Sequence, residues 1–493
     1  GAVLAFARTD DYGGAFPNLV TGAGTVRVSS GTLTLGNAAN SFTGGVALGG
    51  GVLLYSDTTP LTAGTISYVG NAALRQGVSG TLANPLAIAS GVTGTFDSQG
   101  YAATLSGMVS GAGNLRKVGT GMLTLTGSLV YSGSTIVDAG TLVFASGVSS
   151  TTSKIYVGFG AGTAGSVIQQ AGTVLTVGTA SAGNDVISLG GGGGYGYYRN
   201  AGGTLATGQL APGGNVVGAN TTGIFEQNGG STTVSTGVGG WVVFGWQGTN
   251  ANGVLNIFDG SVTNNSTGND TRMAFVASGT NMGMLNLLGP GASYTHSLNT
   301  RGIEMAAAAT NFGSWVNLNG GVLTTNFIKA TQVATVPSYL GFNSGTLRAA
   351  SSATLVSSLT AATIWSGGAT IDTNGFSATI SQGLLAPSGT GVSTIPVTAG
   401  GSGYVGPPAV RITGGGGAGA SAIAIVDLDP ASPTYGQLTG IQITSSGTGY
   451  TSTPTVTLVG GTSATTVAAT LDVASLAAGV SGGLTKIGAG TLI

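Results

Sequence analysis

The sequence predicts an all-β fold, a right-handed parallel β-helix (solenoid) with a small all-β unit inserted near its end. Three observations favour this fold. Glycine supplies 94 of the 493 residues, charged residues make up 5% and hydrophobic residues 41%, so the chain can bury a core although it has few helix formers. Short runs rich in Val, Ile, Thr and Leu alternate with glycine turns. Several sequence patterns also recur along the chain.

The first recurring pattern joins a Gly-Ala-Gly turn, an apolar strand and a Leu-Thr-Leu strand. It spans 22–55 (GAGTVRVSSGTLTL…) and 111–145 (GAGNLRKVGTGMLTL…), and a third copy opens at 482–493 (GGLTKIGAGTLI). An Asp-turn-Gly-aromatic element precedes it at 94–109 and again at 368–385. Both ends of the chain fall inside such repeats, so we expect either a segment of a longer protein or a protein whose last coil is completed by something else.

The central region has a rhythm of its own, in which short strands meet a glycine turn at intervals of about 30 residues, as one coil of three short strands requires. A β-sandwich array is the alternative, but sandwich domains need about 100 residues. The last glycines of these turns are Gly172, Gly203, Gly230, Gly260, Gly291, Gly321 and Gly345.

Polar residues precede several of these turn glycines at a fixed distance. Glu226, Asn256 and Asn317 lie four residues before the glycine, and Asn286 lies five before it, beside a Gly-Pro insertion. Asparagines at one coil position can stack their amides along the axis, so we predict a structural stack of Asn256, Asn286 and Asn317. The alternative is a surface turn that happens to carry Asn in each copy.

One stretch breaks the pattern of the repeats. Residues 395–471 contain two copies of a Gly-x-Gly-Tyr…Pro-x-Val motif, around Tyr404 and Tyr450, and we interpret them as an inserted all-β unit. The predicted parts are therefore N-terminal repeats at 1–145, central coils at 146–365, a repeat-type coil at 366–394, the insertion at 395–471 and the start of a further repeat at 472–493.

The repeats at 111–127 (GAGNLRKVGTGMLTLTG) and 482–492 (GGLTKIGAGTL) resemble the passenger-associated transport repeat of autotransporter proteins, and LAFARTDDY near the start resembles the segment that often precedes it. The resemblance covers 1–145, 366–390 and 480–493, and the centre is similar only in style. It implies a parallel β-helix, secretion and a surface-exposed passenger, and it implies no catalytic residue. The insertion resembles modules of large secreted and fibre proteins.

Composition argues against several other functions. The net charge of −1 and the scattered basic residues provide no basic stripe for a nucleic acid. Cysteine is absent, and the single histidine, His296, excludes a site of several histidines. No apolar run is long enough for a transmembrane helix. Asp427 and Asp429 form a D-x-D loop that is a candidate Ca²⁺ site, for which a solvated turn is the alternative.

Aromatic residues are the other candidates for ligand contact. Tyr195, Tyr197 and Tyr198 lie in GGGGGYGYYRN, and Trp241 and Trp246 lie in GGWVVFGWQG. Exposed rings among small residues can stack on sugars, whereas packing in the core is the structural alternative. In a continuous strand Phe244 and Trp246 would share a face, with Trp241 on the other.

The sequence thus favours a structural or adhesive segment of a secreted bacterial cell-surface protein, without a cofactor and not an enzyme. Its low charge favours self-association, end to end or laterally, into fibres or a sheath. A glycan or a host-cell or other cell-surface molecule is a further expected ligand. The alternative is a carbohydrate-binding or polysaccharide-degrading β-helix, which requires at least two converging carboxylates.

Overall fold

The computed structural model describes most of the chain, in two compact units. Unit 1 comprises residues 1–156 and 165–178, and unit 2 comprises 157–164 and 179–493. The described residues are 1–11, 15–55, 61–62, 64–178, 186–216, 218–234, 240–246, 248–274, 279–297, 300–306, 312–332 and 336–493.

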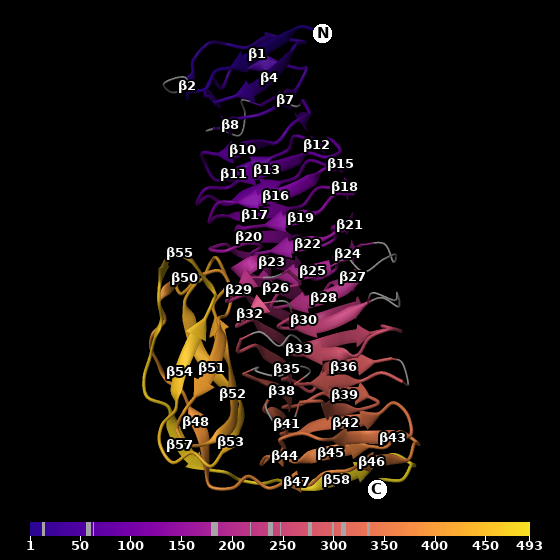
Figure 1. The fold of residues 1–493 in the computed structure, drawn as a ribbon. Coiled ribbons are helices and arrows are strands. Elements are labelled where there is room, and N and C mark those ends of the chain that lie inside the picture. Colours follow the sequence, from indigo (N-terminus) through magenta and orange to yellow (C-terminus); the bar gives the residue numbers. More distant parts are fainter. Residues whose placement is uncertain are drawn as a thin grey trace. The chain divides into compact units, whose positions relative to one another are not determined.

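Unit 1 is a stack of coils, each of which adds one short parallel strand to each of three sheet faces (Figure 1). Hydrogen bonds between adjacent coils, such as Arg75 to Asp97 and the Ser134 amide to Asn114, join residues 22 and 20 positions apart, which is about the length of one coil here. The first face contains β1 (Val3–Ala7), β4 (Thr25–Ser30), β7 (Val46–Leu48), β9 (Ile66–Tyr68), β12 (Leu86–Ile88), β15 (Val109–Gly111), β18 (Leu129–Tyr131), β21 (Ser149–Thr152) and β24 (Val174–Val177).

The other faces of unit 1 follow the same order. The second contains β2 (Ala15–Phe16), β5 (Thr32–Leu35), β8 (Val52–Tyr55), β10 (Ala72–Gln76), β13 (Thr93–Asp97), β16 (Asn114–Val118) and β19 (Thr135–Val137). The third contains β11 (Gly80–Leu82), β14 (Ala103–Leu105), β17 (Met122–Leu125) and β20 (Ala139–Phe144), and β3 (Thr21–Gly22) pairs with β6 (Ser41–Phe42). The strands β22 (Ile155–Val157) and β23 (Ala164–Gln170) lie where the chain divides into units.

Alternation of side chains explains why these residues form coils. In β5, Leu33 and Leu35 are buried inside the coil, while Thr32 and Thr34 face outward. The same pattern recurs in β8, where Leu53 and Tyr55 are buried. In a strand every second side chain points inward, so an apolar residue at every second position is enough to build the core. Threonine favours strands and has a polar hydroxyl, so it suits the outer positions that face water.

Unit 2 continues the three-faced design with longer coils. Its first face contains β27 (Thr204–Thr207), the second half of β30 (Thr222–Val234), the second half of β33 (Asn252–Asn264), β36 (Ala292–His296), β39 (Val322–Thr325), β42 (Gly345–Ala349), β45 (Ala369–Asp372) and β58 (Leu484–Ile487). Its second face contains β25 (Val186–Leu189), β28 (Gln209–Pro212), β31 (Trp241–Phe244), β34 (Thr271–Met273), β37 (Ile303–Met305), β40 (Ile328–Ala330), β43 (Ala353–Ser357) and β46 (Ala378–Ile380).

The third face of unit 2 contains β26 (Tyr195–Ala201), the first halves of β30 and β33, β35 (Met282–Leu287), β38 (Gly313–Leu318), β41 (Ser338–Phe342), β44 (Ala361–Ile364) and β47 (Leu384–Leu385). Short elements at the corners are η1 (Gly191–Gly193), β29 (Gly218–Ala219) and β32 (Gly248–Thr249). Gly230 and Gly260 have positive φ values of 66° and 81° where the chain turns from the third face to the first, a conformation that glycine adopts without strain.

The inserted unit leaves the coils after β47 and returns before β58, which pairs with β45. Its strands are antiparallel: β48 (Thr390–Thr394), β49 (Val397–Ala399), β50 (Ser402–Tyr404), β51 (Ala409–Thr413), β52 (Ala418–Val426), β53 (Leu438–Thr448), β54 (Thr455–Val459), β55 (Thr462–Val467), β56 (Thr470–Leu471) and β57 (Ser475–Ala478). Because β48 pairs with β57, the antiparallel region extends beyond the 395–471 stretch on both sides.

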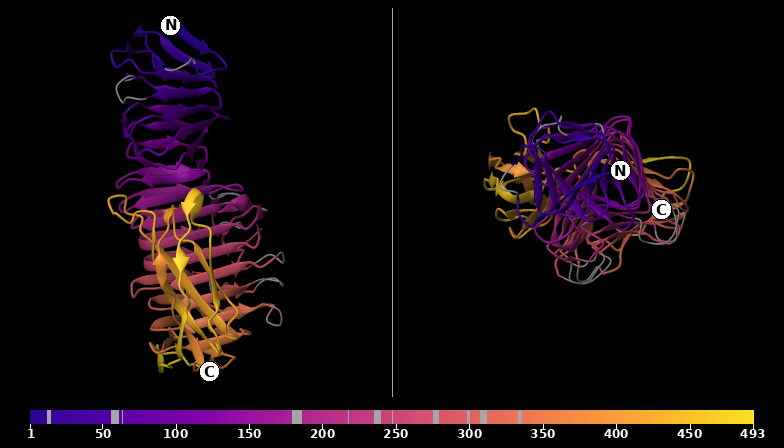
Figure 2. Two further views of the ribbon diagram at one scale, coloured as in Figure 1. Left: turned by 90° about the vertical axis from the view of Figure 1, so that its left-hand side faces the viewer. Right: turned by 90° about the horizontal axis from the view of Figure 1, so that it is seen from above.

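The inserted unit has its own apolar core and lies along the coils of unit 2 (Figure 2). Tyr404 and Tyr450, the tyrosines of its two motifs, are both buried. Ala409 on β51 and Ile423 on β52 pack against residues of the third face of unit 2, so that this face is covered on both sides. The described residues thus form a right-handed parallel β-helix with an antiparallel insertion, and they include no helix long and apolar enough to span a membrane.

Candidate functional site

The third face of unit 2 carries a ladder of polar side chains on its outer side. Asn256, Asn286 and Asn317 occupy matching register positions in β33, β35 and β38. Asn286 Nδ2 donates to Asn256 Oδ1, and Asn317 Nδ2 donates to Asn286 Oδ1, each at 2.8 Å. The three side chains are at most 1% exposed. We call this set, with Glu226, the asparagine ladder.

Glu226 in β30 is the acceptor at one end of the asparagine ladder. Asn256 Nδ2 donates to its Oε1 at 3.5 Å, and the Tyr197 hydroxyl donates to its Oε2 at 2.6 Å. Burial raises the pKa of the Glu226 carboxyl. Between neighbouring rungs the amide Nδ2 always donates toward the Glu226 end, so the ladder is polarised along the stack of coils.

Strands of the inserted unit cover the asparagine ladder. Asn317 Nδ2 also contacts Ser421 Oγ at 3.0 Å and Thr444 Oγ1 at 3.3 Å, on β52 and β53. Arg411 on β51 donates to Asn252 Oδ1 at 2.7 Å and to the Thr280 carbonyl at 2.6 Å. The ladder is therefore an interior feature, packed between coil and insertion.

The three tyrosines that we expected to stack on sugars are buried, so their rings are not available to a ligand at the surface. Tyr195 and Tyr197 lie beneath the inserted unit, where the Tyr195 hydroxyl donates to the Pro407 carbonyl at 2.8 Å. Tyr198 points into the coil and stacks on Phe225, with ring centroids 5.1 Å apart. Since opposite sides of β26 are both covered, neighbouring tyrosines are all removed from solvent.

Trp241 and Trp246 are the aromatic candidates that stay at the surface, both half-buried. Their ring centroids are 4.9 Å apart at an interplanar angle of 45°. The prediction that Trp246 shares a face with Phe244 is wrong, because β31 ends at Phe244 and Gly245 turns the chain with a φ of 57°. Phe244 is fully buried, and the two indoles meet.

Charged residues flank the two indoles. The Arg272 guanidinium lies 5.4 Å from the centre of the Trp241 ring, and Arg272 Nε lies 3.0 Å from Glu304 Oε2. A cation over an indole face is attracted by the ring's quadrupole, so the arginine fixes the orientation of the ring. We refer to Trp241, Trp246, Arg272 and Glu304 as the tryptophan surface.

Asp427 and Asp429 lie in an exposed loop between β52 and β53 and serve as turn caps. Asp427 Oδ1 accepts from the Asp429 amide at 3.0 Å, and Thr434 Oγ1 donates to Asp427 Oδ2 at 2.6 Å. Hydrogen bonding with the side chains of Ser432 and Thr434 and with the Asp429 amide lowers the pKa of the Asp427 carboxyl. Among the described residues no three His, Cys, Asp or Glu side chains gather as a metal site would require.

A cluster of charged residues that sequence reasoning missed recurs in the repeats. In unit 1, Asp97 accepts from Arg75 at 2.8 Å and from the Gln99 amide at 2.9 Å. In unit 2, Asp372 accepts from Arg348 at 2.7 Å and from the Asn374 amide at 2.9 Å. The Asp-turn-Gly elements of the sequence therefore fold alike. The available signal was the sequence DSQG at 97–100 and DTNG at 372–375, in which Gln99 and Asn374 both adopt a positive φ of 51° in the structure.

A lysine on the coil that follows Asp97, Lys117, belongs to the same cluster. Lys117 is fully buried, and its ammonium donates to the carbonyls of Val118, Gly119 and Ala139 at 3.0, 2.7 and 3.0 Å. Burial lowers its pKa to about 7. Lys486 shares the contact two residues on, to the carbonyl of Gly488, and also donates to the carbonyl of Gly490. The lysine in the repeat is thus a structural cap for inward-facing carbonyls.

Comparison with known families identifies the repeats themselves. The passenger-associated-transport-repeat family matches residues 26–54 and 115–144, which are strands β4 to β8 and β16 to β20. The resemblance to autotransporter passengers is confirmed, whereas the resemblance of the insertion to other secreted modules remains a prediction. No curated protein and no solved structure matches the chain.

Proposed function

We propose that this chain, an autotransporter passenger-type β-helical protein, is a structural and adhesive segment of a secreted bacterial cell-surface protein. The observation that carries the proposal is the pair of passenger repeats, each built into consecutive coils of one regular stack. Stacked coils hydrogen-bond to their neighbours along the axis, so stability comes from nearest-neighbour contacts and the stack suits a stiff spacer.

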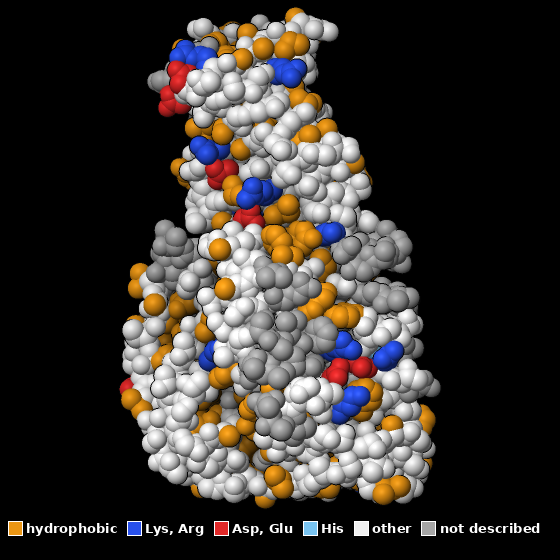
Figure 3. All heavy atoms as spheres, viewed as in Figure 1, with side chains coloured by type: hydrophobic (Ala, Val, Ile, Leu, Met, Phe, Trp, Pro, Cys, Tyr) orange, Lys and Arg blue, Asp and Glu red, His pale blue; other side chains and the backbone are white. Residues whose placement is uncertain are grey.

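Self-association is the finer part of this proposal, and the surface chemistry supports it. Figure 3 shows one face on which most side chains are uncharged and several of the few blue groups lie next to red ones. Ion pairs such as Arg75–Asp97 and Arg116–Asp138 neutralise much of that charge. Little electrostatic repulsion therefore opposes lateral contact between copies.

An exposed apolar position in unit 1 offers a direct test of lateral association. Val130 on β18 is 59% exposed, between two buried neighbours, Leu129 and Tyr131. We expect the wild-type chain to sediment as concentration-dependent oligomers and Val130→Lys to shift them toward monomer. Val130→Thr, which keeps the β-branched shape without charge, is the matched variant. A wild-type chain that remains monomeric at every concentration contradicts self-association.

A glycan-contacting role for the tryptophan surface is a second candidate function. It is favoured by two half-buried indoles beside Arg272 and Glu304, groups that can stack on a sugar ring and hydrogen-bond its hydroxyls. We expect Trp241→Ala and Trp246→Ala to reduce binding on an array of surface glycans. Unchanged binding by both variants counts against this role.

The proposal also includes the absence of catalysis. A polysaccharide-degrading β-helix needs a carboxylate pair that can protonate and attack a glycosidic bond. We therefore expect no release of reducing ends when the chain is incubated with bacterial and plant polysaccharides. Sustained release that tracks the purified chain would establish an enzyme instead.

A further inference from the structure

The asparagine ladder stops at a residue without a side chain. Gly341 in β41 occupies the register position that follows Asn317. Each earlier amide oxygen of the ladder accepts from the next rung, so Asn317 Oδ1 would accept from the side chain of residue 341. This buried oxygen has no hydrogen-bond partner among the described residues.

The indole N–H of Trp365 approaches the same position from the next coil. A Cβ built on Gly341 would lie 3.2 Å from Asn317 Oδ1 and 3.3 Å from Trp365 Nε1. Trp365 is 7% exposed, and within the described part of the chain its Nε1 finds no acceptor. Buried polar groups of folded proteins are nearly always paired, so an unpaired donor and an unpaired acceptor around one glycine need an explanation.

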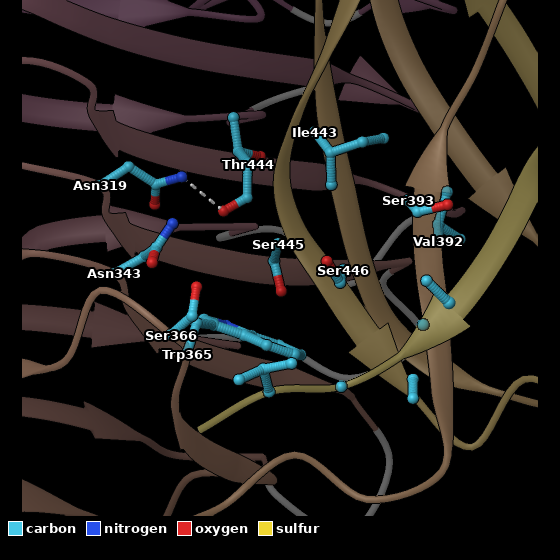
Figure 4. A pocket seen from close by; sticks show the side chains of 15 residues that line it. Asn319, Asn343, Trp365, Ser366, Val392, Ser393, Ile443, Thr444, Ser445 and Ser446 are labelled. Carbon is cyan, nitrogen blue, oxygen red and sulfur yellow. Dashed lines mark hydrogen bonds between the residues drawn. The ribbon is translucent and has the colours of Figure 1, made fainter. Parts of the chain in front are cut away.

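Trp365 also forms part of the wall of a cleft between the coils and the inserted unit (Figure 4). The cleft has a volume of about 240 Å³. Figure 4 shows Asn319 and Asn343 extending from the coils toward the inserted strand that carries Ser445 and Ser446. Its lining residues are Asn319, Asn343, Trp365, Ser366, Gly391, Val392, Ser393, Ile443, Thr444, Ser445, Ser446, Ala477, Ala478, Gly479 and Val480.

A second unpaired acceptor belongs to the wall of this cleft. Asn319 Nδ2 donates to the Thr444 carbonyl at 2.9 Å, which fixes the orientation of the amide. Its Oδ1 then lacks a partner among the residues that the structure describes. The cleft wall therefore holds one unpaired donor, Trp365 Nε1, and one unpaired acceptor, Asn319 Oδ1.

The chemistry of the lining selects one class of ligand. None of the lining residues is charged, so nothing compensates an anion or cation that loses its water there. A purely apolar ligand leaves the amides and hydroxyls unpaired. A hydroxyl group both donates and accepts, and several hydroxyls on a ring with apolar C–H edges match amides, serines and an indole.

We propose that this cleft binds one ring of a neutral saccharide, with ligand hydroxyls paired to Trp365 Nε1 and Asn319 Oδ1. The volume lies just below the ~300–1,000 Å³ of pockets for larger small molecules, so a single ring is the unit that fits. Both unpaired atoms are inaccessible to solvent, so the indole and the amide must shift for a ligand hydroxyl to reach them. The site is independent of self-association and of the tryptophan surface.

The test is a titration of the full chain with glucose, galactose, mannose and N-acetylglucosamine, one at a time into the millimolar range. Calorimetry measures binding, and tryptophan fluorescence reports the indole. We expect at least one sugar to bind, and Trp365→Phe, which keeps an aromatic ring but removes the N–H, to bind it about tenfold or more weakly. Tyr101→Phe, at an exposed aromatic residue that neither lines the cleft nor belongs to the tryptophan surface, is the control and is expected to bind like the wild type.

A blocking variant covers the case in which Trp365→Phe disturbs folding. Ser366 is exposed at the cleft, so Ser366→Trp fills the entrance while leaving the core intact, and we expect it to abolish binding. Circular dichroism and thermal melting check that each variant is folded. Absence of binding by the wild type to all four sugars overturns the proposal, as does undiminished binding by folded Trp365→Phe or Ser366→Trp.

Discussion

Replacing Asn286 by alanine removes the middle rung of the asparagine ladder and should destabilise the coils around it. The substitution deletes two buried hydrogen bonds of 2.8 Å, to Asn256 and from Asn317. Asn317 Nδ2 keeps Ser421 and Thr444 as acceptors, but Asn256 Oδ1 loses the donor that the structure gives it. One orphaned acceptor costs ~1–3 kcal/mol and the lost packing adds to it, so we expect about 2–4 kcal/mol in total.

Hydrogen exchange followed by mass spectrometry is the suitable assay, because a chain with two compact units does not unfold in one step. We expect faster exchange in β33, β35 and β38, and unchanged exchange in unit 1. Asn343→Ala is the matched control, since Asn343 makes an exposed hydrogen bond to the Gly367 amide at 2.8 Å. If Asn286→Ala and Asn343→Ala have equal effects, the ladder does not stabilise the fold as described.

The variant Asn286→Asp tests the polarity of the same ladder. A carboxylate at this position faces the Asn256 amide oxygen, an acceptor, in a buried site, so folding should raise its pKa above the ordinary value of ~3.9. The unfolded chain then releases this proton more readily, and stability falls as pH rises through ~4. We expect greater destabilisation at neutral pH than near pH 4, and the opposite trend contradicts the assigned direction of the hydrogen bonds.

Three further predictions concern buried or docking groups. Burial lowers the pKa of His296 to about 4, so the stability of the fold should fall by up to about 3 kcal/mol as pH drops from ~6.5 to 4. Thermal melting of the wild type and of His296→Asn over this pH range checks this, and parallel curves of melting temperature against pH contradict it. Lys117→Met removes three buried hydrogen bonds and should lower the free energy of local unfolding of unit 1 by about 2–4 kcal/mol, although the Val118 carbonyl keeps the Ser98 amide as a donor. Lys154→Met, at a half-exposed lysine, should change it by less than about 1 kcal/mol in the same hydrogen-exchange experiment. Arg411→Ala removes hydrogen bonds that hold the inserted unit to the coils, so proteolysis should cleave the insertion faster, and an unchanged cleavage rate would argue against this docking contact.

Much of the fold is predictable from the sequence because each coil repeats its pattern locally. The glycine turns and the recurring Leu-Thr-Leu strands indicate a parallel β-helix, and the match to the passenger repeat at 26–54 and 115–144 confirms the resemblance. The spacing of Asn256, Asn286 and Asn317 likewise points to one coil position. In the structure these residues are 30 and 31 residues apart and hydrogen-bond in series.

The covered face of unit 2 was not predictable in the same way, since it depends on contacts between distant segments. Tyr197 and Tyr198 alternate across a strand, and a single exposed face would leave one of them in water. The coil interior buries Tyr198, and the insertion, more than 200 residues away in the sequence, covers Tyr197 on the other side of the strand. A local signal did exist: β35 and β38 carry apolar residues on both sides, and every residue in them is buried. Continuous apolar strands of this kind indicate two covered faces.

Electron microscopy of the purified full chain, across a range of concentrations, tests the central claim most directly. A passenger-type β-helix of low surface charge that acts as a structural and adhesive segment should appear as stiff rods, and these should join end to end or side by side as concentration rises. Isolated particles that stay separate at the highest concentration would contradict the proposed self-association.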